Sequence, residues 1–301
     1  MRRVLWVLAC VTVLGLAPTA PAGAAWIIEQ VARPGAGAGP RAGDQARQVL
    51  TIGANRMKTV MLDRAGKPTN ASIVDLDAQT MISVDYQQRV VTAGTVQEYA
   101  ETLKGATAAT GGQMADAMRQ MQEAMKDMPP EQRQMMEQMM RQQMPGAGMP
   151  GASPPAAPCR PPQVEVRPTG QSAKVAGYSA TRFDVYEDGK FVQEVWVSPA
   201  ITAWRELDPK KLERFGQEMT KAMQALPGCG RDRMRGAGAG PNDPAWKLSA
   251  EGYPVRTVDH GPTEGAVLEV VKAESRAVPA TEFQPPAEFR RQSFKDMLGG
   301  K

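Results

Sequence analysis

The chain has 301 residues, of which 42% are hydrophobic and 23% charged, and its net charge at pH 7 is only +4. So small an excess does not favour nucleic acid as a partner. A single histidine excludes zinc sites of the H-E-x-x-H type, which need two. The length suffices for one large domain or two smaller ones.

The first 24 residues are typical of an export signal. Arg2 and Arg3 precede a mostly apolar stretch over residues 4–16, which is too short to span a membrane comfortably. The small residues Ala22-Gly23-Ala24 then predict cleavage before Ala25. We therefore expect an exported protein, periplasmic or extracellular. The alternative is a lipoprotein signal in which Val7-Leu8-Ala9-Cys10 makes Cys10 a lipidation site.

Two cysteines remain after such cleavage, and we predict a disulfide between Cys159 and Cys229. This disulfide would close a loop of about 70 residues, which stabilises a fold by roughly 4 kcal/mol in the chain-entropy model. A redox-active pair is more often a C-x-x-C motif, which the sequence lacks.

The next part of the chain predicts a flexible linker followed by the first half of a β-domain. Residues 25–45 are assigned to the linker, because 33–45 are rich in Gly, Ala and Pro. Short β-prone runs follow over residues 46–105, at 49–52, 57–61, 71–76, 81–85 and 89–92. Ile73 and Asp75 alternate with Val74 and Leu76, which indicates an antiparallel sheet with one dry and one wet face.

Residues 106–150 predict a methionine-rich helical insert, and a Pro/Ala-rich linker over 151–162 follows it. Five methionines at 114, 118, 121, 125 and 128 lie at alternating spacings of four and three, which places them on one face of a helix. Pro129-Pro130 interrupts the pattern, and methionines at 135, 136, 139, 140 and 144 repeat it. We expect a kinked helix or a pair of helices.

Residues 163–290 predict the second half of the β-domain, and 291–301 a tail. Strand patterns lie at 164–167, 173–175, 179–186, 191–197, 254–258 and 266–273, with a hairpin turn at Glu187-Asp188-Gly189. Asp208-Pro209 begins a helix over 208–226, with an apolar stripe that includes Phe215 and Met219. The predicted fold class is α+β, with a curved antiparallel sheet of about eight to ten strands and the helix across its concave face.

Several short motifs carry a resemblance to a known family. They are Asn55-Arg56-Met57-Lys58, Ile73-Val74-Asp75-Leu76-Asp77, Gln193-Glu194-Val195-Trp196-Val197-Ser198, Gly252-Tyr253-Pro254-Val255 and Phe283-Gln284-Pro285-Pro286. Over residues 46–105 and 163–290 the chain resembles a family of secreted bacterial proteins known as domain of unknown function 4412. That family is similar to the periplasmic lipoprotein carriers, which implies an unclosed β-barrel with helices on the concave side. It implies no catalytic residues.

The methionine face has three interpretations. It can be ordinary core, because Met fills irregular apolar space. It can be an adaptable surface for apolar ligands. It can also bind Cu(I), because Met118/Met121, Met125/Met128 and Met136/Met139 could each present two soft thioethers to one ion.

Enzymatic interpretations are weak. A Ser-His-Asp triad would have to use His260, and the sequence Gly177-Tyr-Ser-Ala180 lacks the second glycine of a nucleophile elbow. Asp75 and Asp77 lie beside a turn, as expected on a wet sheet face. We therefore expect a protein that is not an enzyme and has no cofactor.

The favoured hypothesis is an exported carrier, or chaperone-like binder, of apolar groups such as lipids, lipoproteins or exposed protein segments. The alternatives are a periplasmic copper-binding protein that uses Met118, Met121, Met125 and Met128, and a structural protein–protein interaction module. An apolar ligand or a protein is the expected partner, with peripheral membrane contact possible. The candidate ligand-binding residues are Met114, Met118, Met121, Met125, Met128, Met135, Met139, Trp196, Phe215 and Met219.

Overall fold

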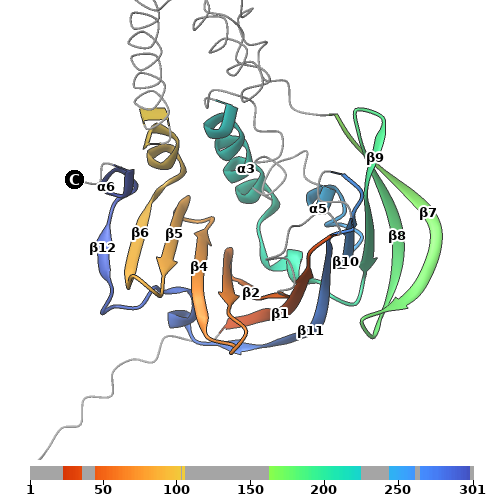
Figure 1. Cartoon of the computed structure of the whole chain (residues 1–301), viewed down its shortest axis with the longest axis horizontal. Coiled ribbons are helices and arrows are strands. Elements are labelled where there is room, and N and C mark those ends of the chain that lie inside the picture. Colours follow the sequence, from red (N-terminus) through yellow and green to blue (C-terminus); the bar gives the residue numbers. More distant parts are fainter. Residues whose placement is uncertain are drawn as a thin grey trace, which may run out of the picture.

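A computed structural model describes residues 23–35, 45–102, 104–105, 163–224, 244–261 and 265–298. Twelve strands of these residues form one sheet in the order β12-β6-β5-β4-β3-β2-β1-β11-β10-β9-β8-β7. Every neighbouring pair is antiparallel except β12 and β6, which are parallel. The sheet is curved and unclosed (Figure 1). The predicted fold class is therefore confirmed.

The centre of the sheet is a strand that the sequence analysis missed. β1 (Gly23–Arg33) pairs with β2 (Ala46–Gly53) on one side and with β11 (Val267–Val278) on the other. Residues 25–33, assigned above to a flexible linker, are therefore strand, because Trp26 and Ile28 alternate with Ala25 and Ile27 and both sets pack on apolar neighbours. The predicted cleavage before Ala25 falls inside β1 and would remove only its two exposed first residues.

The first-half meander is confirmed. It comprises β2, β3 (Arg56–Leu62), β4 (Pro68–Asp75), β5 (Thr80–Asp85) and β6 (Val90–Thr95), each paired with the next. A helical segment over residues 96–102 follows. Its start is a capping box, because the backbone N–H of Glu98 donates to Thr95 Oγ1 and the backbone N–H of Thr95 donates to Glu98 Oε2.

The second half also matches the predicted order of elements. It comprises β7 (Val164–Val175), β8 (Tyr178–Glu187), β9 (Lys190–Ser198), η2 (Ala203–Glu206), α3 (Pro209–Gln224), α5 (Pro244–Lys247), β10 (Tyr253–Asp259) and β11. The two predicted runs at 164–167 and 173–175 are one strand, β7, with an irregularity between Pro168 and Ser172. α3 begins as predicted, since Asp208 Oδ1 accepts the backbone N–H groups of Lys210 and Lys211.

The C-terminal residues form structure where a tail was predicted. After β11 come η3 (Ala280–Phe283), β12 (Arg290–Gln292) and α6 (Phe294–Leu298). β12 pairs with β6 over three residues, so that together with β1 it raises the strand number above the predicted eight to ten. Three polar residues carry no alternation, so this pairing left no pattern in the sequence.

Several predictions fall on residues outside the described ranges. They concern the export signal with Cys10, the methionine-rich insert, the linker over 151–162, and both Cys159 and Cys229. These stay predictions.

Candidate functional site

The face of the sheet on which α3 packs, here called the inner face, carries the largest apolar cluster of the described residues. α3 lies across this face (Figure 1). Leu212, Phe215 and Met219 follow helical spacing and turn one side of α3 toward the sheet. Phe215 is 1% exposed and Met219 is 8% exposed, so these two candidate ligand-binding residues contribute to the core. Their partners in the cluster include Ile28, Ile52, Leu76, Val255 and Val270.

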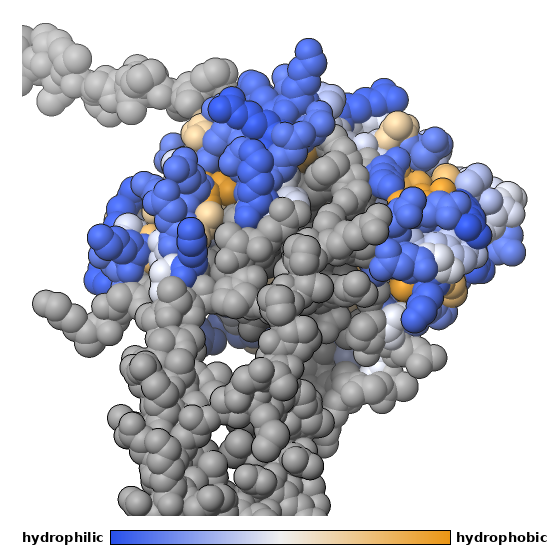
Figure 2. Space-filling model, turned by 90° about the horizontal axis from the view of Figure 1, so that it is seen from above, coloured by the Kyte–Doolittle hydropathy of each residue, from blue (hydrophilic) through white to orange (hydrophobic). Residues whose placement is uncertain are grey.

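A margin of half-buried apolar side chains surrounds this cluster, and we call them the margin residues. They come from β1 to β5, the 96–102 segment and η2, and all pack against the cluster while remaining partly exposed. Seen from above, the described surface shows mostly hydrophilic residues with small hydrophobic patches between them (Figure 2). Large apolar side chains therefore gather around this cluster without complete burial. The margin residues are Trp26, Leu50, Met57, Val74, Met81, Tyr99 and Trp204.

A short row of polar groups crosses the apolar inner face. Gln48 Nε2 donates to Gln30 Oε1 at 2.7 Å, and Gln30 Nε2 donates to the hydroxyl of Tyr253 at 3.3 Å. The ring of Trp204 stacks on that of Tyr253, with centroids 5.4 Å apart and planes 28° apart. Burial raises the pKa of the Tyr253 hydroxyl far above its ordinary value, so that this group stays protonated.

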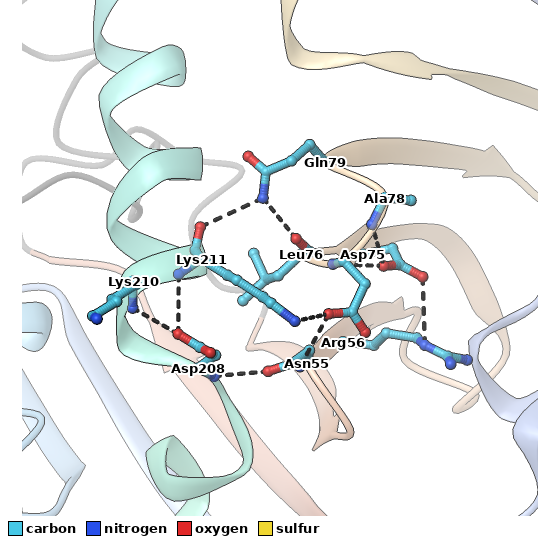
Figure 3. Close-up of polar contacts among 10 residues, drawn as sticks. Asn55, Arg56, Asp75, Leu76, Ala78, Gln79, Asp208, Lys210 and Lys211 are labelled. Atoms are coloured by element: carbon cyan, nitrogen blue, oxygen red, sulfur yellow. Dashed lines mark hydrogen bonds and ion pairs between the residues drawn. The ribbon is translucent and has the colours of Figure 1, made fainter.

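A polar clip holds the first turn of α3 against two turns of the sheet (Figure 3). Asn55 lies at the centre: its Oδ1 accepts the backbone N–H of Asp208 at 2.7 Å, and its Nδ2 donates to Asp77 Oδ1 at 3.1 Å. Lys211 Nζ donates to the same Asp77 oxygen at 2.5 Å. We define the polar clip as Asn55, Asp77, Asp208 and Lys211. It joins the β2–β3 turn, the β4–β5 turn and the start of α3.

Neighbouring groups fix the clip in place. Asp75 Oδ1 accepts the backbone N–H groups of Asp77 and Ala78, and Asp75 Oδ2 lies 3.4 Å from Arg56 Nε. The hydrogen bond from Lys211 is the main cause that lowers the pKa of Asp77, and the same bond raises the pKa of Lys211. The clip therefore fixes the N-terminal end of α3 by charge-assisted contacts. The other end of the helix, at Gln224, lies away from these contacts.

Trp196, the remaining described candidate, lies in a different setting. It packs beside the inner cluster from β9, and its indole N–H donates to Glu194 Oε1 at 2.6 Å. Arg182 Nη1 lies 3.2 Å from Glu194 Oε2. The polar group of Trp196 is thus already satisfied inside the protein, and we leave Trp196 outside the candidate site. The candidate methionines at 114–139 lie outside the described residues.

The side chains considered for catalysis have structural contacts. The ring of His260 lies 4.8 Å from that of Phe191, and the backbone N–H of His260 donates to the Val192 carbonyl. Within the described ranges, no group of three or more His, Cys, Asp or Glu side chains could hold a metal ion. Nor does any helix there have the length and apolar character needed to cross a membrane.

Comparisons with known proteins add no assignment. No family model matches the chain, and no curated protein does. Among solved structures, an uncharacterized conserved protein from Thermus thermophilus is similar with a TM-score of 0.41 and 8% identity over 89% of this chain and 90% of that one. The MucA/MucB complex of Pseudomonas aeruginosa gives a TM-score of 0.34 and 8% identity, over 89% of this chain and 57% of that one. Both TM-scores are below 0.5, so neither similarity supports a functional argument.

Sequence reasoning found the apolar side of α3 but missed the polar groups beside it. Gln30 lies in the unrecognised β1, and Trp204 lies in the short η2 between a strand and a helix. Tyr253 was assigned only to a family motif. The clip residues are far apart in the sequence, and two of them have a local signal. Asp208 precedes Pro209 at a predicted helix start, and Asn55 suits the left-handed φ of +60° in its tight turn.

Proposed function

We propose that this chain is an exported, non-enzymatic binding protein that carries apolar groups on its inner face. Acyl chains of lipids or lipoproteins and exposed apolar protein segments are the guests we consider. The observation that supports the proposal is the set of margin residues, large apolar side chains that remain half-buried beside α3. When a guest covers apolar surface that is partly exposed to water at a concave face, the free energy of the system falls.

In the proposed mechanism, α3 is a cover held at one end. The polar clip keeps its first turn on the sheet, while Phe215 and Met219 occupy the apolar face further along. A guest displaces these two side chains and takes over their contacts with the sheet. Met57 and Met81 suit this exchange, because unbranched thioether side chains repack around different shapes.

A direct test is a native mass spectrum of the protein purified without detergent, compared with its denatured mass. We expect an added mass that disappears on denaturation and whose value identifies a lipid or another apolar guest. A bare chain that also fails to bind a pyrene-labelled alkane contradicts the proposal.

Substitutions in the margin residues locate the site. Met57→Gln and Met81→Gln should each weaken binding of a pyrene-labelled alkane by about tenfold, which corresponds to the loss of roughly 1.4 kcal/mol of apolar burial. Met57→Leu and Met81→Leu keep the apolar surface and should bind normally. Val60→Gln, on the opposite face of β3, is the matched control: it alters stability but should not alter alkane affinity. Equal affinity in the Gln and Leu variants would place the site elsewhere.

A further inference from the structure

Two hydrogen-bond donors lie together at the inner face without an acceptor in the described chain. The Nε1 atom of Trp204 is buried and has no partner among those residues. The hydroxyl of Tyr253 accepts a hydrogen bond from Gln30, but none of the described groups accepts its own proton. The two rings are stacked, so both donors belong to one small region between η2 and the start of β10.

Such donors indicate an acceptor that comes from outside the chain. A buried N–H without a partner destabilises the folded protein, and in binding sites a few well-placed polar groups orient an otherwise apolar ligand. Trp204 is itself a margin residue, half-buried against the cluster that contains Phe215 and Met219. An apolar guest that packs on the margin residues beneath α3 would contact the ring of Trp204, on which Tyr253 stacks.

The charge of the acceptor follows from the surroundings. The buried polar residues of the described chain are Gln30, Thr51, Thr92 and Ser198, so none of its buried side chains carries a charge. A carboxylate buried beside Trp204 and Tyr253 would lose hydration without gaining a buried cationic side chain as partner, which is strongly unfavourable. A carbonyl oxygen is neutral, and it can accept a hydrogen bond from either donor or from both.

We propose that Trp204 and Tyr253 bind the carbonyl oxygen of a neutral acyl ester or amide whose hydrocarbon chain lies on the inner face. This inference rests on the proposed function and specifies its ligand class. Esterified or amide-linked acyl chains are preferred, and free fatty acids and plain alkanes bind more weakly.

The test uses three pyrene-labelled probes of equal chain length: an alkane, a methyl ester and a free acid at pH 8. The wild-type protein should bind the ester about tenfold more tightly than the alkane. This difference corresponds to about 1.4 kcal/mol of binding free energy, supplied by hydrogen bonds to the carbonyl oxygen. The acid should bind no better than the alkane. Trp204→Phe and Tyr253→Phe keep a ring in place and remove one donor each, so each should reduce the ratio of ester affinity to alkane affinity from about tenfold towards one.

Trp196→Phe is the matched control, since it also removes an indole N–H, but one that already has Glu194 as its acceptor. It should keep the full preference for the ester. The ratio of the two affinities within each variant separates a lost donor from a misfolded protein, which loses both probes. Wild-type protein that binds alkane and ester equally overturns this inference and leaves the proposed function standing. Failure to bind any of the probes overturns both.

Discussion

The two faces of the sheet are covered in different ways. On the inner face, one large cluster packs under a single helix and is surrounded by half-buried methionine and aromatic side chains. On the outer face, two small clusters lie under the strap formed by residues 279–292, with Phe283 and Phe289 as anchors. Arginine guanidinium groups cover these rings, Arg56 at 5.7 Å from the Phe283 centroid and Arg89 at 5.0 Å from that of Phe289.

The difference separates structural packing from a surface suited to binding. The outer rings are buried, and Lys58 Nζ ties the strap to the sheet by donating to the carbonyl and carboxylate oxygens of Glu282. The rest of the outer face carries ion pairs such as Lys272–Glu274. The inner face instead keeps partly exposed apolar side chains and two donors without acceptors in the described chain. A surface that combines large half-buried apolar side chains with donors that lack acceptors is expected where a protein binds an apolar ligand.

The largest expected effect is on the inner face. Phe215→Ala should lower the free energy of unfolding by about 4 kcal/mol, because Phe215 is 1% exposed and its removal leaves a cavity between α3 and the sheet. Urea denaturation measures the loss. Val271→Ala, on a side chain that is 48% exposed, should change stability by less than about 0.5 kcal/mol. Similar losses in the two variants would contradict the assignment of the core.

The corresponding change on the outer face should affect stability alone. Phe289→Ala should lower the free energy of unfolding by about 3 kcal/mol, because the ring is buried against Tyr86 and covered by Arg89. Denaturation should show this loss, whereas the affinity for a pyrene-labelled alkane, measured below the unfolding transition, should stay unchanged. A loss of affinity as large as that in Met57→Gln would mean that the two faces do not differ in function.

Breaking the polar clip should have a smaller effect. Asn55→Gly removes the acceptor for the backbone N–H of Asp208 and keeps a residue suited to the left-handed φ at this position. We expect the free energy of unfolding, measured by urea denaturation, to fall by about 1 kcal/mol. Asn55→Ala should lose more, since it adds backbone strain to the same missing contact. If the glycine variant were as stable as the wild type, the clip would not hold α3.

The smallest effect should depend on pH. The pKa of Asp77 is lowered in the folded protein, mainly by the hydrogen bond from Lys211, so this carboxylate stabilises the fold above its ordinary pKa. That contribution is lost as the pH falls through the lowered pKa. Wild-type protein should therefore be slightly more stable than Asp77→Asn at pH 7, and urea midpoints should converge as the pH falls below about 4. A difference that widens on acidification would contradict the role of Asp77.

Much of the fold could be predicted from local sequence. Alternation identified β2 to β6 and the strands from β7 to β11, and Asp208-Pro209 marked the start of α3. β1 was missed because its first residues adjoin the apolar stretch predicted to be an export signal and its last adjoin a Gly-rich run. β12 was missed because its pairing depends on where the strap places three polar residues.

The site was less predictable than the fold. Helical periodicity was sufficient to place Phe215 and Met219 on one apolar side of α3. The donors of Trp204 and Tyr253 meet only because η2 and β10 are adjacent in the folded chain, and their missing acceptors are a property of three-dimensional packing. Side chains whose role depends on what surrounds them leave no spacing pattern in the sequence.

The central place of β1 has a consequence for the time course of folding. Gly23 pairs with Val278 and Arg33 with Val267, so β1, near the beginning of the chain, can pair on this side only after β11, near the end of the chain, is available. Contacts of such long sequence separation form slowly, and until they form, β1 has one neighbour and an open edge. When a ribosome releases the chain progressively, the sheet therefore stays incomplete until nearly all of the polypeptide has emerged.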